Sequence, residues 1–300
     1  MNARPTRPSF PFRRIVVWGL KTARYDAYHY IHHGFARAAR KMGIPGLWVD
    51  DDARYRDLVR PGDLVISVDI AGSQMPLVKG ARYVLHNFPD DVLRQLRPEE
   101  YIRLQVYTKG VERGAEKIAG ATWFDAASRT LYQPWGTPLL RDEFLPPTAY
   151  RLRSTAFWVG SVWDNEEHQG NVKEYALLWA SLRSHGIRLV QARVPEWLHA
   201  TTIARSAVAP AIGGRWQVEQ GHMTCRTVKN VSFGQVAATN IGEFRQIFGD
   251  AFVHSEDIEE LVDRLMRLSE RERQELVRVE QELIAPHTYD WKLLHMAERF

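Results

Sequence analysis

Two patterns of apolar and polar residues alternate along the chain. Short apolar runs flanked by polar residues predict strands at 13–20, 62–69, 81–88, 156–163, 187–192, 207–214 and 235–242. Longer stretches with apolar residues spaced by about 3.6 positions predict helices at 25–43, 90–96, 99–118, 172–186, 196–206, 226–234, 256–284 and 287–300. Residues 121–137 predict two short strands joined by a turn. This alternation is typical of parallel sheets covered by helices on both faces.

The alternation restarts after residues 141–155, a segment with two adjacent prolines that we expect to link two domains. The predicted fold class is α/β, with two Rossmann-like, doubly wound domains facing a central cleft. We expect an N-terminal domain at 15–148, a C-terminal domain at 149–286 and a last helix at 287–300. Such folds bind ligands at the carboxyl ends of their strands. Residues that follow strands are therefore the first candidates for a site.

The composition is that of an ordinary globular protein, with 45% hydrophobic and 25% charged residues. No apolar run approaches the roughly 20 residues that would cross a bilayer, and the N-terminus lacks the apolar core of a signal peptide. The single cysteine, Cys225, excludes an internal disulfide and a cysteine-based metal cage. We therefore expect a cytoplasmic protein.

The net charge of +4 comes from the N-terminus, where Arg4, Arg7, Arg13 and Arg14 stand without an acidic residue. The rest of the chain carries 36 basic and 36 acidic residues. We expect residues 1–14 to form a disordered tail that could make weak contact with an anionic membrane surface. No basic stretch is interleaved with aromatic residues, so a nucleic-acid partner is not expected.

The segment CRTVKNVSFGQVAATN, residues 225–240, carries the strongest functional signal. On the predicted helix, Arg226 and Lys229 are three positions apart and share a face. A guanidinium and an ammonium group that converge on one point suit a diphosphate. The small residues that follow, including Gly234, would let backbone amides approach a ligand closely. The alternative is a cationic pair on a surface helix, with small residues that serve packing.

Three segments resemble bacterial glycosyltransferases of the GT-B class. CRTVKNVSFGQVAATNIGEF resembles their donor-side segment, in which a basic residue, a lysine and an aromatic-glycine pair precede a strand. SERERQELVRVEQELIAPHTYDW is similar to the end of the family that includes the spore-maturation-protein-like enzymes, and WVGSVWDNEEHQGN resembles the first strand and loop of the donor domain. Together they cover roughly residues 156–291.

The resemblance implies metal-independent transfer of a sugar from a nucleotide-sugar co-substrate to a glycan, a glycolipid or another hydroxyl acceptor, for example in surface polysaccharide synthesis. It also implies a last helix that crosses back onto the N-terminal domain. Lys229 and Arg226 would stabilise the leaving phosphate, Glu243 would accept hydrogen bonds from a ribose, and Trp216 would stack on a base or sugar. The candidate donor-binding residues are Gly160, Ser161, Trp216, Arg226, Lys229, Asn230, Gly234, Asn240 and Glu243.

A glutamate pair seven residues apart marks many retaining members of this class, and it is absent here. Gln235 and Glu243 stand at the corresponding positions. The stereochemical outcome of the transfer therefore stays open at the level of sequence.

If the transfer inverts configuration, a general base must lie on the N-terminal side of the cleft. Asp69 and His86 each end a predicted strand and are the candidates. Tyr25, Asp26 and His29, together with Tyr28, are candidates for acceptor binding by hydrogen bonding and stacking.

His29 and His33, four positions apart, could bind a metal ion, but no HExxH-type carboxylate accompanies them, and we predict no metal. Trp135 is expected to pack in the core. Two other functions stay open: a sugar-nucleotide epimerase of related fold, and a non-catalytic nucleotide-sugar binding protein. A Rossmann dehydrogenase is disfavoured because no GxGxxG follows the first strand.

Overall fold

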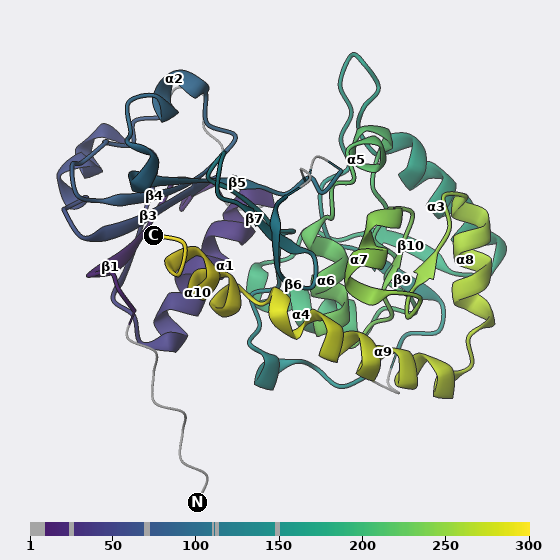
Figure 1. The fold of residues 1–300 in the computed structure, drawn as a ribbon. Helices are drawn as coiled ribbons and strands as arrows, with labels where there is room; N and C mark the ends of the chain where they lie inside the picture. Colours follow the sequence, from purple (N-terminus) through teal and green to yellow (C-terminus); the bar gives the residue numbers. More distant parts are fainter. Residues whose placement is uncertain (1–9, 24–26, 69–72, 110, 112–113, 148–150) are drawn as a thin grey trace, which may run out of the picture.

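The computed structural model describes residues 10–23, 27–68, 73–109, 111, 114–147 and 151–300. Figure 1 shows two α/β halves side by side, the N-terminal half on the left and the C-terminal half on the right. The last helix returns to the N-terminal half, next to the strands where the chain began.

The N-terminal half is built on one eight-stranded sheet of order β2-β1-β3-β4-β5-β8-β7-β6. The strands β2, β1, β3, β4, β5 and β8 pair in parallel, and β7 and β6 extend the sheet as an antiparallel hairpin. The strands are β1 (Arg14–Trp18), β2 (Gly46–Val49), β3 (Asp63–Val68), β4 (Arg82–His86), β5 (Tyr101–Gln105), β6 (Glu116–Ala119), β7 (Thr122–Asp125) and β8 (Thr130–Tyr132).

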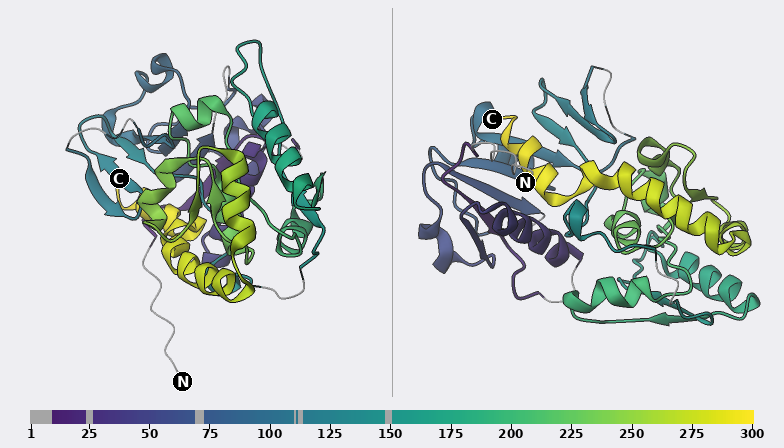
Figure 2. Two further views of the ribbon diagram at one scale, coloured as in Figure 1. Left: turned by 90° about the vertical axis from the view of Figure 1, so that its right-hand side faces the viewer. Right: turned by 90° about the horizontal axis from the view of Figure 1, so that it is seen from below.

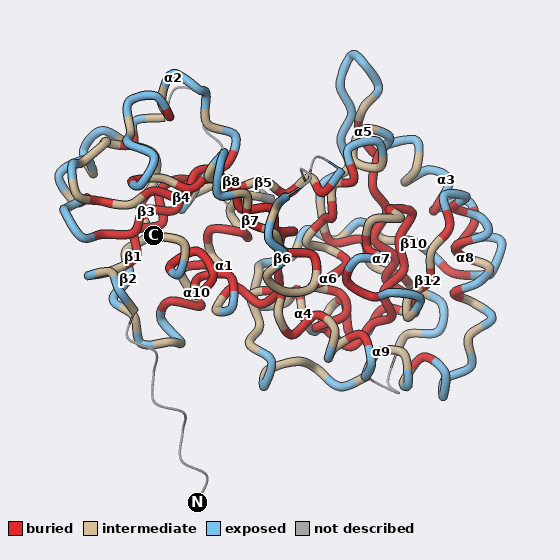
Figure 3. The backbone as a smooth tube through the Cα atoms, viewed as in Figure 1, coloured by how far each residue is buried: buried red, intermediate tan, exposed pale blue. Residues whose placement is uncertain are grey.

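The central strands of this sheet are buried on both faces, which explains their continuous apolar sequences. All of β3 is buried, and so are four residues each of β1 and β4. Helix α1 (Ala27–Met42) covers one face. Two short elements, η1 (Ala53–Leu58) and α2 (Asp90–Leu93), cover the other face, and η2 (Pro98–Glu100) leads into β5. Figure 3 shows the buried strands as the core of this half.

The C-terminal half contains two short parallel pairs of strands. β9 (Thr155–Trp158) pairs with β10 (Arg188–Gln191), and β11 (Ala238–Thr239) pairs with β12 (Val253–His254). The segment 207–212 runs between them: Ala207 N donates to Thr155 O at 2.8 Å, and Ala211 N donates to Ala238 O at 2.7 Å. The predicted strand at 207–214 is therefore wrong as a regular strand. Pro210 has no N–H to give to a ladder, and this extended segment bridges the two pairs instead.

Helices surround these strands. They are α3 (Val172–Ser184), α4 (Glu196–Ala204), α5 (Arg215–Glu219), α6 (Cys225–Ser232), α7 (Arg245–Phe248), α8 (Ile258–Arg267) and α9 (Glu270–Ile284), with the 3-10 turns η3 (Arg141–Glu143), η4 (Gly242–Phe244) and η5 (Ala285–His287). Five of the eight residues of helix α6 are buried. Its Val228 and Val231 share a core cluster with Ala121 of the N-terminal half and Ala237 of the C-terminal half, so α6 lies between the two halves (Figure 1).

Helices α9 and α10 (Tyr289–Ala297) carry the chain from the C-terminal half back to the N-terminal half (Figure 2). Tyr289 packs on Phe35 of α1, with ring centroids 4.6 Å apart. A Cβ atom at Gly34 would overlap the Tyr289 ring, so only glycine lets the two helices approach this closely. Leu293 and Met296 complete the contact within the core of the N-terminal half.

Two sequence-based expectations for the N-terminal half need correction. Residues 99–118 are not helical, since they contain β5 and β6. In β5, Ile102 and Leu104 are buried while Arg103 between them is exposed, which is the alternation of a strand. The two glutamates before β5, with which the predicted helix began, lie in the short turn η2.

The basic tail is shorter than expected. Residues 1–9 lie outside the described residues, but Arg13 and Arg14 both form ion pairs with the buried Asp63, at 3.3 and 3.0 Å. These two arginines therefore anchor the first strand instead of extending into solvent. Within the described parts of the chain, no helix is long and apolar enough to cross a membrane.

Candidate functional site

A cavity of about 550 Å³, here called the central cavity, lies between the two halves of the chain. The N-terminal half contributes Tyr28, Tyr30, Ile31, Asn87, Tyr107 and Trp135. The C-terminal half contributes the loop after β9, one residue of α4, the start of α5 and the segment that leads into α6. Asn87 follows β4 and Gly160 follows β9, so the cavity lies at the carboxyl ends of strands from both halves.

The charge of the central cavity is positive. Arg226 and Lys229 line it, and no aspartate or glutamate is among its described lining residues. Both cations are half-buried, and neither forms an ion pair with a carboxylate of the described residues. A half-buried cation without a protein counter-charge retains most of its attraction for an anion. The cavity is therefore suited to an anionic ligand.

The guanidinium of Arg226 is held by stacking. Its Cζ lies 3.8 Å from the ring centroid of Trp158, and its Nη1 donates to Ile212 O at 3.4 Å. Burial lowers the pKa of Arg226 from 12.5 to about 10, so the group stays protonated at neutral pH. Stacking fixes the plane of the guanidinium and leaves further N–H groups for a ligand.

Gly160 sets the space that the guanidinium occupies. A Cβ atom there would overlap Nη2 of Arg226, and the φ of Gly160 is +153°, which favours glycine. We expect Gly160→Ala to displace the guanidinium and to weaken anion binding roughly tenfold, measured by titration calorimetry with pyrophosphate. Gly186→Ala is the matched control, because Gly186 also has a positive φ (+71°) but no atom within 4 Å of the added methyl. Equal affinity in the two variants would contradict this role of Gly160.

Lys229 approaches the cavity from the next turn of α6. Its Nζ lies 5.0 Å from the ring centroid of Tyr30, and the Tyr30 ring lies 4.6 Å from that of His199. Burial, followed by the charge of Lys229, lowers the pKa of His199 to about 4. His199 is therefore neutral at physiological pH, and Lys229 is the charged group on this wall.

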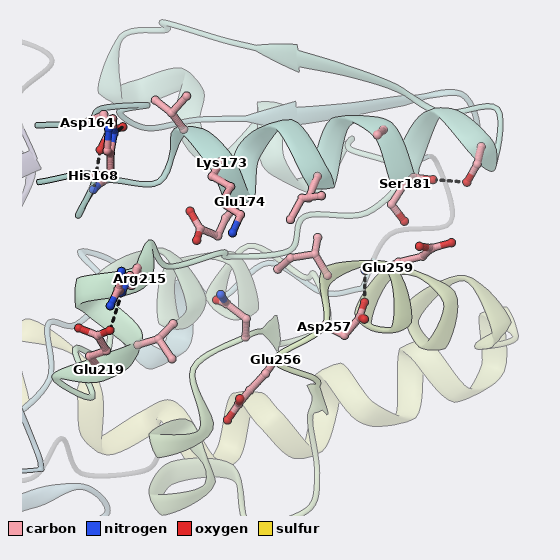
Figure 4. Close-up of a pocket in the computed structure, with 18 residues that line it drawn as sticks. Asp164, His168, Lys173, Glu174, Ser181, Arg215, Glu219, Glu256, Asp257 and Glu259 are labelled. Carbon is pink, nitrogen blue, oxygen red and sulfur yellow. Dashed lines mark hydrogen bonds and ion pairs between the residues drawn. The ribbon is translucent and has the colours of Figure 1, made fainter. Parts of the chain in front are cut away.

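A larger cavity of about 1000 Å³, here called the outer cavity, lies between α3, α5 and the start of α8 (Figure 4). Lys173 and Arg215 are the Lys and Arg side chains among its described lining residues, and carboxylates outnumber them. The carboxylates are Asp164, Glu174, Glu219, Glu256, Asp257 and Glu259. Asp257 caps α8 by accepting from Glu259 N and Glu260 N. This cavity therefore repels anions, and the smaller central cavity is the candidate site for a phosphate-containing ligand.

Solved structures share the overall fold at low sequence identity. The structure described as trehalose-6-phosphate from E. coli bound with UDP-2-fluoro glucose has a TM-score of 0.56 and 10% identity, covering 95% of this chain and 98% of that chain. An alpha-glucosyltransferase in complex with UDP and a 13-mer DNA has a TM-score of 0.55 and 10% identity, covering 92% and 95%. A trehalose-6-phosphate synthase has a TM-score of 0.54 and 10% identity, covering 95% and 98%.

The fold is GT-B. The predicted fold class is thereby confirmed, with two Rossmann-like halves that face a central cavity. No family model matches the sequence, and no curated protein matches it either. The narrower resemblance to the spore-maturation-protein-like family therefore stays a prediction.

Five of the candidate donor-binding residues line the central cavity of this GT-B fold. They are Gly160, Ser161, Trp216, Arg226 and Lys229. Trp216 lies on α5, and its ring contacts that of Tyr107 in the opposite half at 5.3 Å between centroids. The structure thus brings together the cations, the glycine-containing loop and an aromatic residue that sequence reasoning had assigned separately.

Four other candidates lie outside the lining of the central cavity, and their groups contact the protein. Asn230 donates to Ala209 O at 2.7 Å. Oδ1 of Asn240 accepts from Gly213 N at 2.8 Å, and its Nδ2 donates to Gly213 O at 2.9 Å. A Cβ atom at Gly234 would meet Pro146 O, so this glycine serves packing. Glu243 lies 3.5 Å from Lys109 of the other half. The small sequence after α6 therefore serves packing, as the alternative interpretation had it.

Gln235, at one position of the missing glutamate pair, has a structural role as well. Its amide donates to the carbonyls of Ile203, Ala204 and Ser206, the residues that end α4 and follow it. It is buried and does not line the central cavity. The side chain at this position therefore caps the end of α4 and does not contact the cavity.

The candidates on the N-terminal side are less well supported. His86 is buried behind Trp135, with its Nδ1 2.9 Å from Leu104 O, and it does not line the central cavity. It is not placed to take a proton from a ligand there, which corrects its assignment as a base. His29 lies against Leu20 O and Trp48, also outside the lining. Tyr25, Asp26 and Asp69 lie outside the described residues.

The possible histidine pair does not form a metal centre in the described parts of the chain. No three His, Cys, Asp or Glu side chains there are close enough together to hold a metal ion. Nδ1 of His33 contacts the carboxylate of Glu196 on α4 instead, and the buried His32 accepts from Val68 N at 3.2 Å. These histidines therefore link elements of the fold.

Tyr28, a predicted candidate for stacking on a sugar, lines the central cavity. Sequence reasoning missed two aromatic residues of the N-terminal wall and two histidines of the opposite wall. Tyr30 belongs to α1, Tyr107 follows β5, His199 belongs to α4 and His222 precedes α6. Tyr107 and His222 also form a β-bridge between the two halves. The only available signal was local: each follows or begins an element whose end faces the cleft.

Proposed function

We propose that the protein is a glycosyltransferase that binds a nucleotide sugar in the central cavity and transfers the sugar to a hydroxyl acceptor. The observation that carries the proposal is the pair of half-buried cations, Arg226 and Lys229, which face a cavity without a described carboxylate. The GT-B fold supports it, because the neighbours with this fold include an alpha-glucosyltransferase.

The donor we propose is a UDP-sugar. One neighbouring structure is bound with UDP-2-fluoro glucose and another is in complex with UDP. Its diphosphate would lie against Arg226 and Lys229, and its base or sugar would stack on Trp216. In this arrangement the C-terminal half, residues 149–286, is the donor domain, and residues 15–148 form the acceptor domain.

The chemistry assigned to the cations is leaving-group stabilisation. As the bond between the sugar and the diphosphate breaks, negative charge accumulates on the phosphate oxygens. Preorganised cations in a partly dehydrated cavity stabilise this charge more than they stabilise the ground state. Arg226 is preorganised by its contact with Trp158, and this protein-based charge would make a divalent metal unnecessary.

The acceptor we propose is the hydroxyl group of an uncharged glycan or glycolipid. The N-terminal wall of the central cavity has no charged side chain among Tyr28, Tyr30, Ile31, Asn87, Tyr107 and Trp135. Aromatic faces and an amide suit the stacking and hydrogen bonding of sugar rings. Of the two candidate bases, Asp69 is the one we retain, because in the sequence it directly follows β3, at the carboxyl end of that strand.

A thermal-shift screen against UDP, GDP, CMP and dTDP, each with and without a divalent metal, tests the proposed function. A ligand at a hundredfold excess over its dissociation constant adds about 2.7 kcal/mol of stability, and each kcal/mol raises the melting temperature by roughly 2–4 °C. We expect a shift with UDP that does not depend on the metal. No shift with any of the four nucleotides would contradict the proposal.

A further inference from the structure

His222 lies on the wall of the central cavity, between α5 and α6. Its backbone forms a β-bridge with Tyr107 of the opposite half, and its ring lies 5.1 Å from the Tyr107 ring and 6.2 Å from the Trp216 ring. The side chain is therefore held where the two halves of the cavity meet.

The hydrogen bonds around His222 determine which ring nitrogen carries the proton. Gly214 N donates to Oε1 of Gln217 at 3.1 Å, which fixes that oxygen as an acceptor. The other end of the same amide, Nε2 of Gln217, lies 3.3 Å from Nδ1 of His222. Because an amide nitrogen only donates, Nδ1 must accept, and the proton of the neutral ring lies on Nε2.

The Nε2–H group of His222 is a buried donor without an acceptor among the described residues. Burial, and secondly the nearby His86, lowers the pKa of His222 to about 4, so the ring stays neutral at physiological pH. A buried donor without a partner is unfavourable, and an acceptor oxygen of a ligand would relieve this penalty. The rings of Tyr107 and Trp216 lie next to the imidazole, and the hydrogen bond from Gln217 is made to Nδ1 and not to Nε2.

We propose that His222 is a neutral hydrogen-bond donor whose Nε2–H binds an oxygen atom of the ligand in the central cavity. This inference rests on the proposed function and assigns a binding residue to the same site. The two cations attract the charge of the diphosphate, whereas a neutral N–H adds direction without adding charge. Gln217 and Gly214 are the positioning residues, because they fix the tautomer of the ring.

The tautomer can be measured on the ligand-free protein. In ¹⁵N-histidine-labelled protein, we expect His222 to show a protonated Nε2 and an unprotonated Nδ1 between pH 5.5 and 8. Its resonances are assigned by their absence from His222→Gln. A protonated Nδ1, or a ring that titrates within this range, would overturn the inference.

Affinity measurements test whether the ligand uses the donor. We expect His222→Phe to weaken binding about tenfold, whereas His222→Gln, which keeps an N–H group near the position of Nε2, stays within about threefold of wild type. Weaker binding of both UDP and UDP-glucose places the bonded oxygen on the UDP part of the ligand. Weaker binding of UDP-glucose alone places it on the sugar.

Two results distinguish the failure of this inference from the failure of the proposed function. If wild-type protein binds UDP or UDP-glucose and His222→Phe binds both equally well, the inference alone is wrong. If wild-type protein binds neither, the proposed function is wrong and the inference fails with it. Melting temperatures of both variants exclude unfolding as the cause of a loss.

Discussion

Replacement of Arg226 with methionine is expected to weaken UDP binding by about 100-fold, which corresponds to about 2.7 kcal/mol. The guanidinium is half-buried and stacked on Trp158, and no carboxylate of the described residues neutralises it. A charge-assisted contact with a diphosphate is therefore worth more here than on an open surface. Titration calorimetry of wild type and Arg226→Met with UDP measures the difference.

The same substitution should leave the free energy of unfolding nearly unchanged. Methionine keeps apolar contact with the Trp158 ring, and its loss of the cation–π contact is offset because a charge is no longer buried without a counter-ion. Affinity and stability therefore separate in this variant. A melting temperature that falls together with the affinity would indicate a structural role for Arg226.

Turnover should fall in Arg226→Met and in Lys229→Ala by roughly 100-fold or more, by analogy with the removal of one preorganised donor. Lys109→Ala is a control in the same cleft, because Lys109 pairs with Glu243 outside the lining of the central cavity. Its variant should retain far more activity than the other two.

The second large effect concerns stability. Lys292, on α10, is buried, and its Nζ has no hydrogen-bond partner among the described residues. Burial lowers its pKa to about 7. We expect Lys292→Met to raise the free energy of unfolding by roughly 1–3 kcal/mol at pH 6, because methionine fills the same space without a buried charge. Chemical denaturation measures this gain.

The gain from Lys292→Met should depend on pH. The pKa of Lys292 is about 7 in the folded state and about 10.5 when unfolded, so the unfolded chain binds one more proton between these values. Wild-type stability should therefore rise with pH across this window. The advantage of the variant should be full below about pH 7 and absent above about pH 10.5.

His287 and His295, which face Lys292, have lowered pKa values and should not reverse this trend. Lys79→Met is the matched control, because Lys79 is exposed and its change should stay within about 0.5 kcal/mol. An equal effect of the two substitutions would contradict the assignment of an unfavourable buried ammonium group.

The sequence predicted the elements whose pattern is local. The run LVISV of β3 and the turn between β7 and β8 are examples, because their burial pattern and turn residues specify them. Strand β5 was missed because residues 99–118 were predicted as one helix from their apolar spacing. Segment 207–214 was predicted as a regular strand, but its residues bridge two strand pairs without a ladder of their own. In both cases, the deciding contacts are with distant segments.

The site shows the same division. Arg226 and Lys229 could be paired from helical spacing alone, whereas Gly160 was a candidate only through the family resemblance, because the predicted strand at 156–163 contains it. Asn240 and Gly234 could not be excluded from the site by sequence. Only the fold shows that the amide of Asn240 is hydrogen-bonded to the backbone of Gly213, and that Gly234 packs against Pro146 O. Residues such as His222 and Tyr107, more than 100 positions apart, meet only when the two halves pack together.

The most direct test of the central claim uses the single cysteine of the chain. Cys225 lines the central cavity next to Arg226, so its alkylation reports on that cavity alone. We expect saturating UDP to slow the alkylation of Cys225 by tenfold or more, as followed by mass spectrometry, with or without a divalent metal. Alkylation at an unchanged rate, under conditions where UDP is bound, would show that the nucleotide binds elsewhere and would contradict the account.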